Sequence, residues 1–206
     1  MNETLKDPYD SHLSETGLTQ GPKVVVFAAP SGTGKSTISK MILNDLPVLT
    51  FSVSATTRPQ RAGETHGKEY YFLSKHVFEQ TINEDGFIEY SKHFENYYGT
   101  LKSEVDRAYS ESKVLLLDLD VDGALNVKKI YRERALLVFI LPPSREILED
   151  RLRKRGTDSE ASILKRLERV DYELSQSIQF DTRVVNDELN RAVDEIKSTI
   201  QAFIRN

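Results

Sequence analysis

Residues 28–37, with the sequence AAPSGTGKST, constrain the fold of this chain more than any other stretch. They follow a compact apolar run, Val24–Phe27, and precede a segment whose apolar residues recur at the three- and four-residue steps of a helix. A strand, a glycine-bearing turn that ends in Gly-Lys-Ser, and a helix form the context in which a phosphate-binding loop works. Glycines let backbone N–H groups surround an anion, and the N-terminus of the following helix carries partial positive charge. The stretch therefore predicts a nucleoside triphosphate site, with Lys35 on the β/γ-phosphates and the Ser36 hydroxyl on Mg²⁺.

One position in this loop departs from the usual pattern. Ala29 stands where the first glycine is expected. The alternative interpretation is a glycine-rich turn that merely caps a helix. We disfavour it, because the strand, the loop and the helix all occur in the required order.

Composition narrows the class of protein. The chain has 206 residues, of which 38% are hydrophobic and 29% charged, with a net charge of −4 and no cysteine. These values suit a globular protein without a global basic field, so no nucleic-acid partner is expected. The absence of cysteine excludes disulfides, a thiol nucleophile and cysteine-based zinc sites. The first residues lack the apolar region of a signal peptide, and no apolar run approaches the ~20 residues that span a bilayer. We therefore expect no membrane association and a cytoplasmic location.

Strands and helices alternate along most of the chain, which predicts an α/β fold with a parallel sheet. The expected strands of this sheet lie at 23–29, 51–54, 114–120, 135–141 and 183–186, and the expected helices at 35–46, 102–112, 121–131, 144–154, 160–180 and 189–204. Between 55 and 101 the pattern changes to short aromatic, strand-like pieces separated by glycines, with one helix at 75–84. This region predicts a small inserted mixed sheet. Residues 1–22 are polar and without period, which is typical of a tail that lacks fixed structure unless it docks.

Two acidic residues end the apolar strand that begins at Val114. Asp118 and Asp120 are separated by Leu119, so their side chains point to opposite sides of the strand. Ligands of open α/β sheets bind at the carboxyl ends of strands, where an aspartate can orient Mg²⁺-bound water or hydrogen-bond a substrate. The alternative is that the acids serve the N-terminus of the next helix, which is plausible for one of them and less so for both.

Cations gather at two further places. Arg58 and Arg61 lie in a Pro/Gly-flanked loop, and an arginine fork binds phosphate in bidentate fashion. We expect the hydroxyls of Tyr70 and Tyr98 to complete this second phosphate site. The second of these places is the basic stretch at residues 145–169, which is broken by Gly156. The break suggests a mobile lid whose cations neutralise a phosphoryl group in transfer. A solvated basic helix face is the alternative for that stretch.

Taken together, the motifs resemble the guanylate kinase family, the small P-loop kinases that phosphorylate GMP. The resemblance covers residues 23–204. It rests on residues 30–37 (PSGTGKST), 52–64 (SVSATTRPQRAGE), 67–72 (GKEYYF), 87–90 (FIEY), 96–100 (NYYGT), 117–120 (LDLD), 142–144 (PPS) and 151–156 (RLRKRG). The arginine loop at 52–64 and the Asn-Tyr-Tyr-Gly box are far more specific than the phosphate loop.

The resemblance implies a parallel-sheet P-loop NTPase core formed by 23–53, 103–144 and 176–206, an inserted GMP-binding domain at 54–102 and a helical lid at 145–175. ATP would be bound by residues Ala29, Pro30, Ser31, Gly32, Thr33, Gly34, Lys35, Ser36, Thr37 and Asn186. GMP would be bound by Ser54, Arg58, Arg61, Tyr70, Glu89, Tyr98, Thr100 and Asp120. Lys35, Arg151, Arg155 and Arg166 would be the catalytic cations, and Mg²⁺ would be held by Ser36 and, through water, by Asp118. The division of roles between Asp118 and Asp120 stays open.

Two further departures from the family pattern affect these expectations. Thr100 stands where serine is common, which keeps the hydroxyl, and Asp122 stands where glutamine is common, which changes the polar network at that strand end. A non-catalytic module of the same fold is one alternative, but such modules typically lose the ATP loop. A kinase for another phosphorylated acceptor is a second, against which Glu89 and Ser54 argue. The sequence leaves the oligomeric state, monomer or homodimer, undecided.

Overall fold

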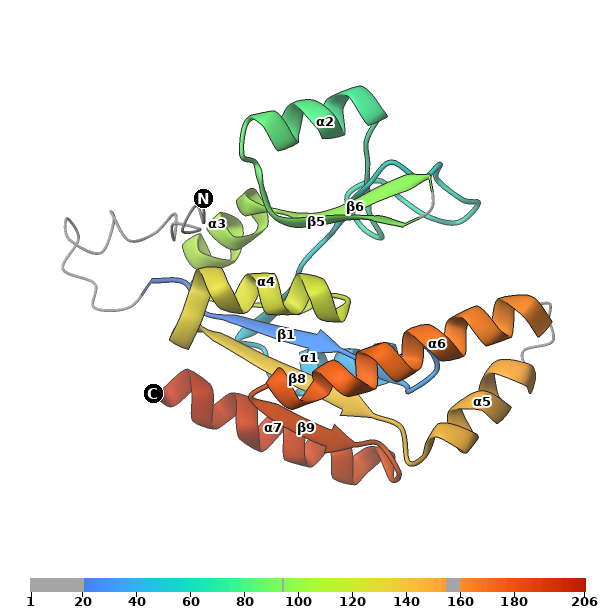
Figure 1. Cartoon of the computed structure of the whole chain (residues 1–206). Coiled ribbons are helices and arrows are strands. Elements are labelled where there is room, and N and C mark those ends of the chain that lie inside the picture. Colours follow the sequence, from blue (N-terminus) through green and yellow to red (C-terminus); the bar gives the residue numbers. More distant parts are fainter. Residues whose placement is uncertain (1–20, 94, 155–159) are drawn as a thin grey trace, which may run out of the picture. The chain divides into compact units, whose positions relative to one another are not determined.

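The computed structural model describes residues 21–93, 95–154 and 160–206 (Figure 1). The expected tail therefore lies almost wholly outside the described residues, as does the break at Gly156. The chain forms two compact units. One comprises Val48–Leu117, Asn126–Arg134 and the described residues before Val25, and the other comprises Val25–Pro47, Asp118–Leu125 and Ala135–Asn206.

The larger sheet has five strands in the order β2-β7-β1-β8-β9. Its strands are β1 (Val24–Ala28), β2 (Leu49–Phe51), β7 (Val114–Asp118), β8 (Ala135–Leu141) and β9 (Thr182–Val185). β2 runs parallel to β7, and β8 runs parallel to β9. All of β1 and nearly all of β7 and β8 are buried, as expected for apolar strands that are covered on both faces.

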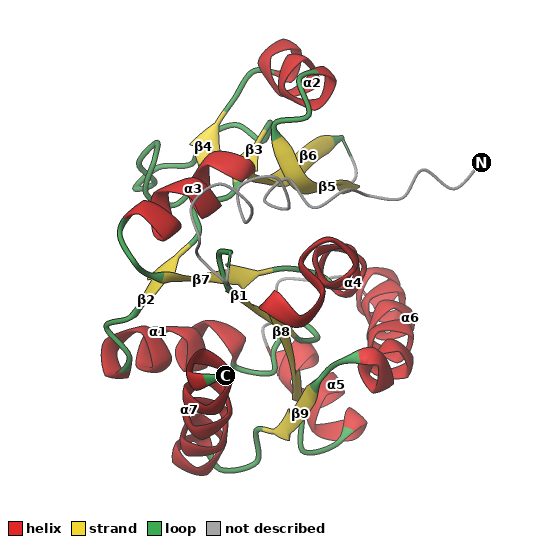
Figure 2. Ribbon diagram, turned by 90° about the vertical axis from the view of Figure 1, so that its left-hand side faces the viewer, coloured by secondary structure: helices red, strands yellow, loops and turns green. Residues whose placement is uncertain are grey.

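Helices cover both faces of this sheet. They are α1 (Lys35–Asp45), α4 (Val121–Tyr131), α6 (Glu160–Gln176) and α7 (Leu189–Arg205), and α5 (Arg145–Lys154) lies beyond the end of β8 (Figure 1). Around β1, β8 and β9, helices α1 and α7 lie on one side and α6 on the other (Figure 2). The buried residues Ile196 and Ile200 lie one turn apart on α7, so an apolar stripe faces the core.

The smaller sheet is mixed and has the order β4-β3-β6-β5. It consists of β3 (Ala55–Thr56), β4 (Tyr71–Phe72), β5 (Phe87–His93) and β6 (Asn96–Leu101), accompanied by α2 (Lys75–Asn83) and α3 (Lys102–Ser110). β3 pairs in parallel with β4 and antiparallel with β6, which in turn pairs antiparallel with β5. Phe78 of α2 stacks on Phe87 and Tyr97, with ring centroids 4.3 and 5.3 Å away, and gives this sheet its own apolar core.

The predicted α/β class, with a mainly parallel sheet and a separate small mixed sheet, is confirmed. One element is misplaced in the prediction. The second strand was expected at 51–54, but β2 covers Leu49–Phe51, and residues 52–54 form a connection to β3. The expected last turns of the helix at 160–180 are instead a 3₁₀ turn, Ser177–Gln179, in which the Ser177 hydroxyl donates to the Leu174 carbonyl at 2.7 Å. In the part of the chain that the structure describes, none of the helices is both long and apolar enough to span a membrane.

Candidate active site

The loop between β1 and α1 is built around two glycines in the left-handed region, Gly32 (φ 95°) and Gly34 (φ 94°). The buried Thr33 hydroxyl donates to the Pro30 carbonyl at 2.9 Å, and the Thr33 carbonyl accepts a 2.6 Å hydrogen bond from the Asn186 amide. A Cβ atom on Gly34 would lie only 2.7 Å from that amide nitrogen. The loop therefore needs glycine at this position, and Asn186, expected on the ATP side of the site, holds the loop backbone.

Helix α1 begins directly after this loop, at Lys35. Among the described residues no side chain caps it, because its cap position is Gly34. Ser36 and Thr37 are exposed in the first turn. The Lys35 ammonium forms an ion pair with Asp118 at the carboxyl end of β7. A glycine loop, an uncapped helix N-terminus and a lysine together make an anion site.

Asp120 serves the N-terminus of the next helix, which was the alternative interpretation for one of the two acids, Asp118 and Asp120. Its carboxylate accepts the Gly123 N–H at 2.8 Å and so caps the N-terminus of α4. Its other oxygen lies 3.4 Å from the Arg169 guanidinium. The two aspartates thus differ: Asp118 faces the phosphate loop, and Asp120 caps α4 and contacts α6.

Asp122 enters a polar cluster that the sequence did not predict. It pairs with Arg169 at 3.2 Å and accepts a 2.6 Å hydrogen bond from the Tyr172 hydroxyl. That hydrogen bond to a carboxylate raises the pKa of Tyr172. Arg169 also donates to Glu173 at 3.2 Å, and burial raises the pKa of the Glu173 carboxyl. The departure at Asp122 is therefore accommodated by residues of α6.

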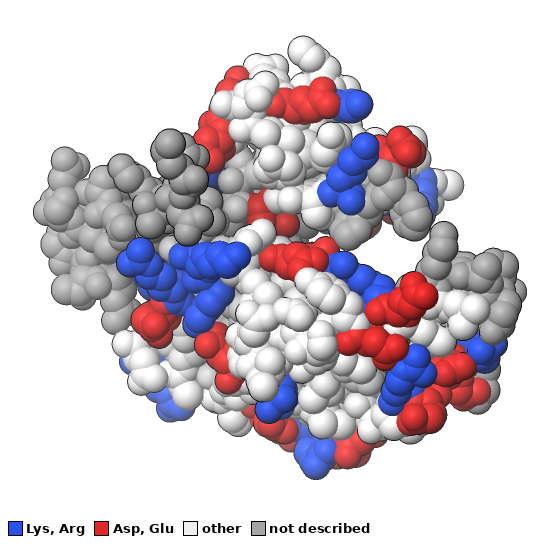
Figure 3. All heavy atoms as spheres, in the orientation of Figure 1, with Lys and Arg blue, Asp and Glu red and all other residues white. Residues whose placement is uncertain are grey.

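Acidic partners accompany the basic residues of α5 and α6. Arg145 donates to Asp171 at 2.7 and 3.0 Å, and Arg153 donates to Glu149 at 2.9 Å. Basic and acidic side chains alternate on this part of the visible face (Figure 3). Arg145 and Arg153 thus fit the interpretation of a solvated helix face. Of the expected catalytic arginines, Arg166 is half-buried on α6, Arg151 lies on α5 and Arg155 falls outside the described residues.

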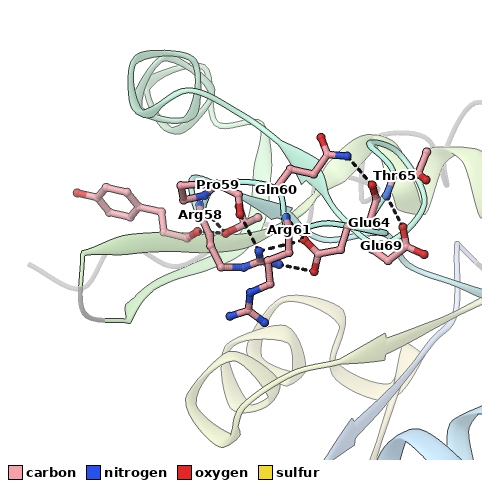
Figure 4. Close-up of polar contacts among 9 residues, drawn as sticks. Arg58, Pro59, Gln60, Arg61, Glu64, Thr65 and Glu69 are labelled. Carbon is pink, nitrogen blue, oxygen red and sulfur yellow. Dashed lines mark hydrogen bonds and ion pairs between the residues drawn. The ribbon is translucent and has the colours of Figure 1, made fainter.

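Three of the side chains predicted to form a second phosphate site gather around Arg58, in the unit that contains the mixed sheet. Its guanidinium donates to both carboxylate oxygens of Glu64, at 2.7 and 3.0 Å (Figure 4). It also lies 5.4 Å from the Tyr70 ring centroid and 5.6 Å from that of Phe72. The Tyr70 ring contacts Tyr98 edge-on, at 6.1 Å between centroids. The structure thus gathers Arg58, Tyr70 and Tyr98, as predicted.

Glu64 is a site residue to which sequence reasoning gave no role. Its hydrogen bonds with Arg58 raise the pKa of that guanidinium, and the same hydrogen bonds, with one from the Arg61 N–H, lower the pKa of the Glu64 carboxyl. The Arg61 guanidinium is exposed and points away from this carboxylate (Figure 4). The sequence offered one signal for this pair: an acidic residue stands six residues after an arginine in a glycine-bearing turn.

Glu89 and Thr100 face each other across β5 and β6. They are register partners, and the buried Thr100 hydroxyl donates to the Glu89 carboxylate at 2.7 Å. Ser54, just before β3, accepts the Tyr71 N–H on its carbonyl at 2.9 Å. The Thr100 side chain therefore orients a carboxylate on the same small sheet whose strand β3 leads into the loop of Arg58.

Comparisons with known proteins identify the family of this chain. A family model described as guanylate kinase matches residues 21–203. A guanylate kinase from Chlorobium chlorochromatii is 52% identical over 182 residues, which make up 88% of this chain and 96% of that protein. One from Chlorobaculum tepidum is 50% identical over 93% of this chain and 97% of its own length. The crystal structure of guanylate kinase from Anaplasma phagocytophilum superposes with a TM-score of 0.70 at 29% identity, covering 88% of this chain and 85% of that one. The P-loop NTPase core is thereby confirmed, and the chain belongs to the guanylate kinase family.

Proposed function

We propose that this protein transfers the γ-phosphoryl group of ATP to GMP, giving ADP and GDP. The observation that carries the proposal lies in the unit with the small sheet. There a threonine orients the Glu89 carboxylate, and the Arg58 guanidinium lies over Tyr70 and Phe72, with Tyr98 against Tyr70. A guanine offers two adjacent donors, N1–H and the exocyclic amine, to a carboxylate, whereas adenine presents an acceptor at N1. A nucleoside monophosphate with a guanine base therefore fits this set of residues.

In the ATP half, Lys35 exchanges Asp118 for the β- and γ-phosphate oxygens, while the backbone of residues 29–37 surrounds them. The Ser36 hydroxyl and, through water, the Asp118 carboxylate would hold Mg²⁺, since a hard cation prefers oxygen ligands. When bound, Mg²⁺ would offset the negative charge of the ATP phosphates. Asn186 keeps the loop in shape through its hydrogen bond to the Thr33 carbonyl.

In the GMP half, Arg58 exchanges Glu64 for the GMP phosphate, assisted by Arg61 and the hydroxyls of Tyr70 and Tyr98. Glu89, Ser54 and Thr100 contact the guanine, and Asp120 lies near the base. The Thr100 hydroxyl holds one oxygen of Glu89, so that the carboxylate keeps a fixed orientation.

The chemical step is a direct in-line displacement without a phosphoenzyme. The attacking phosphate oxygen of GMP is already ionised, so no general base is needed. Positioning and cations supply the rate enhancement, and Arg151, Arg155 and Arg166 neutralise charge on the transferring group. In the proposed function, residues 145–175 form a lid and residues 54–102 form the GMP-binding domain. The core consists of residues 23–53, 103–144 and 176–206. Cytoplasmic location stays a prediction from the sequence.

Replacing Glu89 with glutamine tests the guanine site. The substitution keeps the size of the side chain but replaces one acceptor oxygen with a donor, which opposes a donor of the base. We expect kcat/KM for GMP to fall by about 10- to 100-fold, because hydrogen bonds to charged groups contribute roughly 1.5–3 kcal/mol, while kcat/KM for AMP stays unchanged or rises. A coupled assay of ADP formation with GMP and AMP measures both values.

The matched control is Glu79→Gln on α2, an exposed glutamate outside the site, which should leave both values unchanged. If Glu89→Gln left the preference for GMP over AMP where it is in the unsubstituted protein, the base site would lie elsewhere.

A further inference from the structure

A buried carboxylate outside the proposed site lies under the segment that leads into it. Glu104, in the first turn of α3, is 2% exposed. Its two oxygens accept hydrogen bonds from the Val53 N–H (2.8 Å), the Tyr71 hydroxyl (3.1 Å) and the Arg107 guanidinium (2.9 and 3.3 Å). Burying a carboxylate is costly, and here each oxygen has two donors that offset the cost.

Arg107 extends this network to the end of β2. Its guanidinium donates to the Thr50 hydroxyl at 3.3 Å and to the Phe51 carbonyl at 3.2 Å. Glu104 contacts the same segment two residues further on, at Val53. The pair therefore holds both sides of the turn that leaves the sheet. Glu104 raises the pKa of Arg107, so the guanidinium stays charged.

The turn leads directly to Ser54. The Ser54 carbonyl accepts the Tyr71 N–H at 2.9 Å, and the Tyr71 hydroxyl returns to Glu104 at 3.1 Å. Ser54 is thus fixed from the chain before it and from the strand beside it, and both connections end on one carboxylate. The residue before Tyr71 is Tyr70, which contacts the Arg58 guanidinium.

An apolar side chain would fill the space beneath this turn without the desolvation cost of a carboxylate. An apolar side chain cannot accept hydrogen bonds from a backbone N–H, a tyrosine hydroxyl and a guanidinium in fixed directions. Two of these donors belong to Val53 and Tyr71, the neighbours of Ser54 and Tyr70. Their position indicates that Glu104 helps to place Ser54 and Tyr70.

We propose that Glu104, oriented by Arg107, is a positioning residue that places Ser54 on the guanine and Tyr70 on the phosphate of GMP. This inference rests on the proposed function. Glu104 is not proposed to contact the nucleotide; it acts through the Val53 N–H and the Tyr71 hydroxyl, the neighbours of Ser54 and Tyr70.

The test is a double-mutant cycle between Glu104→Ala and Ser54→Ala, with KM measured for GMP and for ATP. We expect Glu104→Ala to raise KM for GMP about tenfold, with KM for ATP and kcat within about twofold of the unsubstituted values. Ser54→Ala in the Glu104→Ala background should add almost nothing, because Ser54 is already misplaced. Glu104→Gln keeps part of the hydrogen bonding and should raise KM for GMP by only about threefold.

Glu111→Ala is the matched control. Glu111 is an exposed residue of the same segment and the other acidic partner of Arg107, at 3.5 Å, and its loss should leave KM for GMP unchanged. If the effects of Glu104→Ala and Ser54→Ala on KM for GMP simply multiply, or if KM for GMP and KM for ATP change equally, the inference is overturned, because a merely structural role predicts those outcomes.

If Glu104→Ala does not fold, Tyr71→Phe offers a second test, because it removes only the hydroxyl that links Tyr71 to Glu104. An unchanged KM for GMP in both Tyr71→Phe and Glu104→Gln would also overturn the inference. Absence of GMP phosphorylation in the unsubstituted protein would contradict the proposed function itself.

Discussion

Lys35→Met is expected to lower kcat by about 10³-fold or more while leaving the affinity for GMP nearly unchanged. Methionine keeps the length of the side chain but removes the cation that would lie on the β- and γ-phosphates. The residues proposed to bind GMP, apart from Asp120, belong to the other unit, whereas Lys35 pairs with Asp118 in its own unit. Steady-state kinetics and calorimetric titration with GMP separate the two effects.

Lys40→Met is the control for this substitution, since Lys40 is an exposed lysine on the same helix. Asp118 loses its partner in Lys35→Met, but it is 30% exposed and can be hydrated, so the fold should persist. Turnover that survived in Lys35→Met would show that the assignment of the phosphate loop is wrong.

Arg58→Ala is expected to raise KM for GMP by about 100-fold and to change KM for ATP much less. The guanidinium can offer two charge-assisted hydrogen bonds to a phosphate, each worth roughly 1.5–3 kcal/mol, and its stacking on Tyr70 and Phe72 fixes its direction. KM for each substrate, measured with the other saturating, checks this expectation.

Lys68→Ala provides a comparison, because Lys68 is an exposed cation close in sequence that makes no proposed contact with GMP. Arg58→Ala also leaves Glu64 without its main partner, so thermal unfolding should be followed in parallel. Equal effects on KM for GMP and ATP would contradict the assignment of separate phosphate sites.

Local patterns in the sequence predicted most of the fold. The helix at 121–131 and the strand at 135–141 have the predicted bounds, because turn signals and changes in hydrophobic pattern coincide there. The phosphate loop was recognisable because glycine spacing, lysine and flanking elements are all local. β2 was misplaced because Leu49 and Phe51 provide too short an apolar run to define its ends.

Several contacts between distant residues were not predicted from the sequence. Arg169 and Asp120 are 49 residues apart, and Glu104 and Val53 are 51 apart, without a pattern that links either pair. The capping role of Asp120 was foreseen as an alternative for one of the two acids, but its pairing with Arg169 was not. Glu64 was visible in the arginine loop, yet only the structure shows that it holds Arg58.

The most direct test of the central claim is a coupled assay of the unsubstituted protein with ATP and each nucleoside monophosphate in turn. We predict that GMP is phosphorylated with a kcat/KM at least about 10²-fold higher than AMP, CMP or UMP, with one ADP formed per GDP, because only guanine offers both donors to Glu89. Comparable rates with AMP, or ADP formation that does not depend on the monophosphate, would contradict the account.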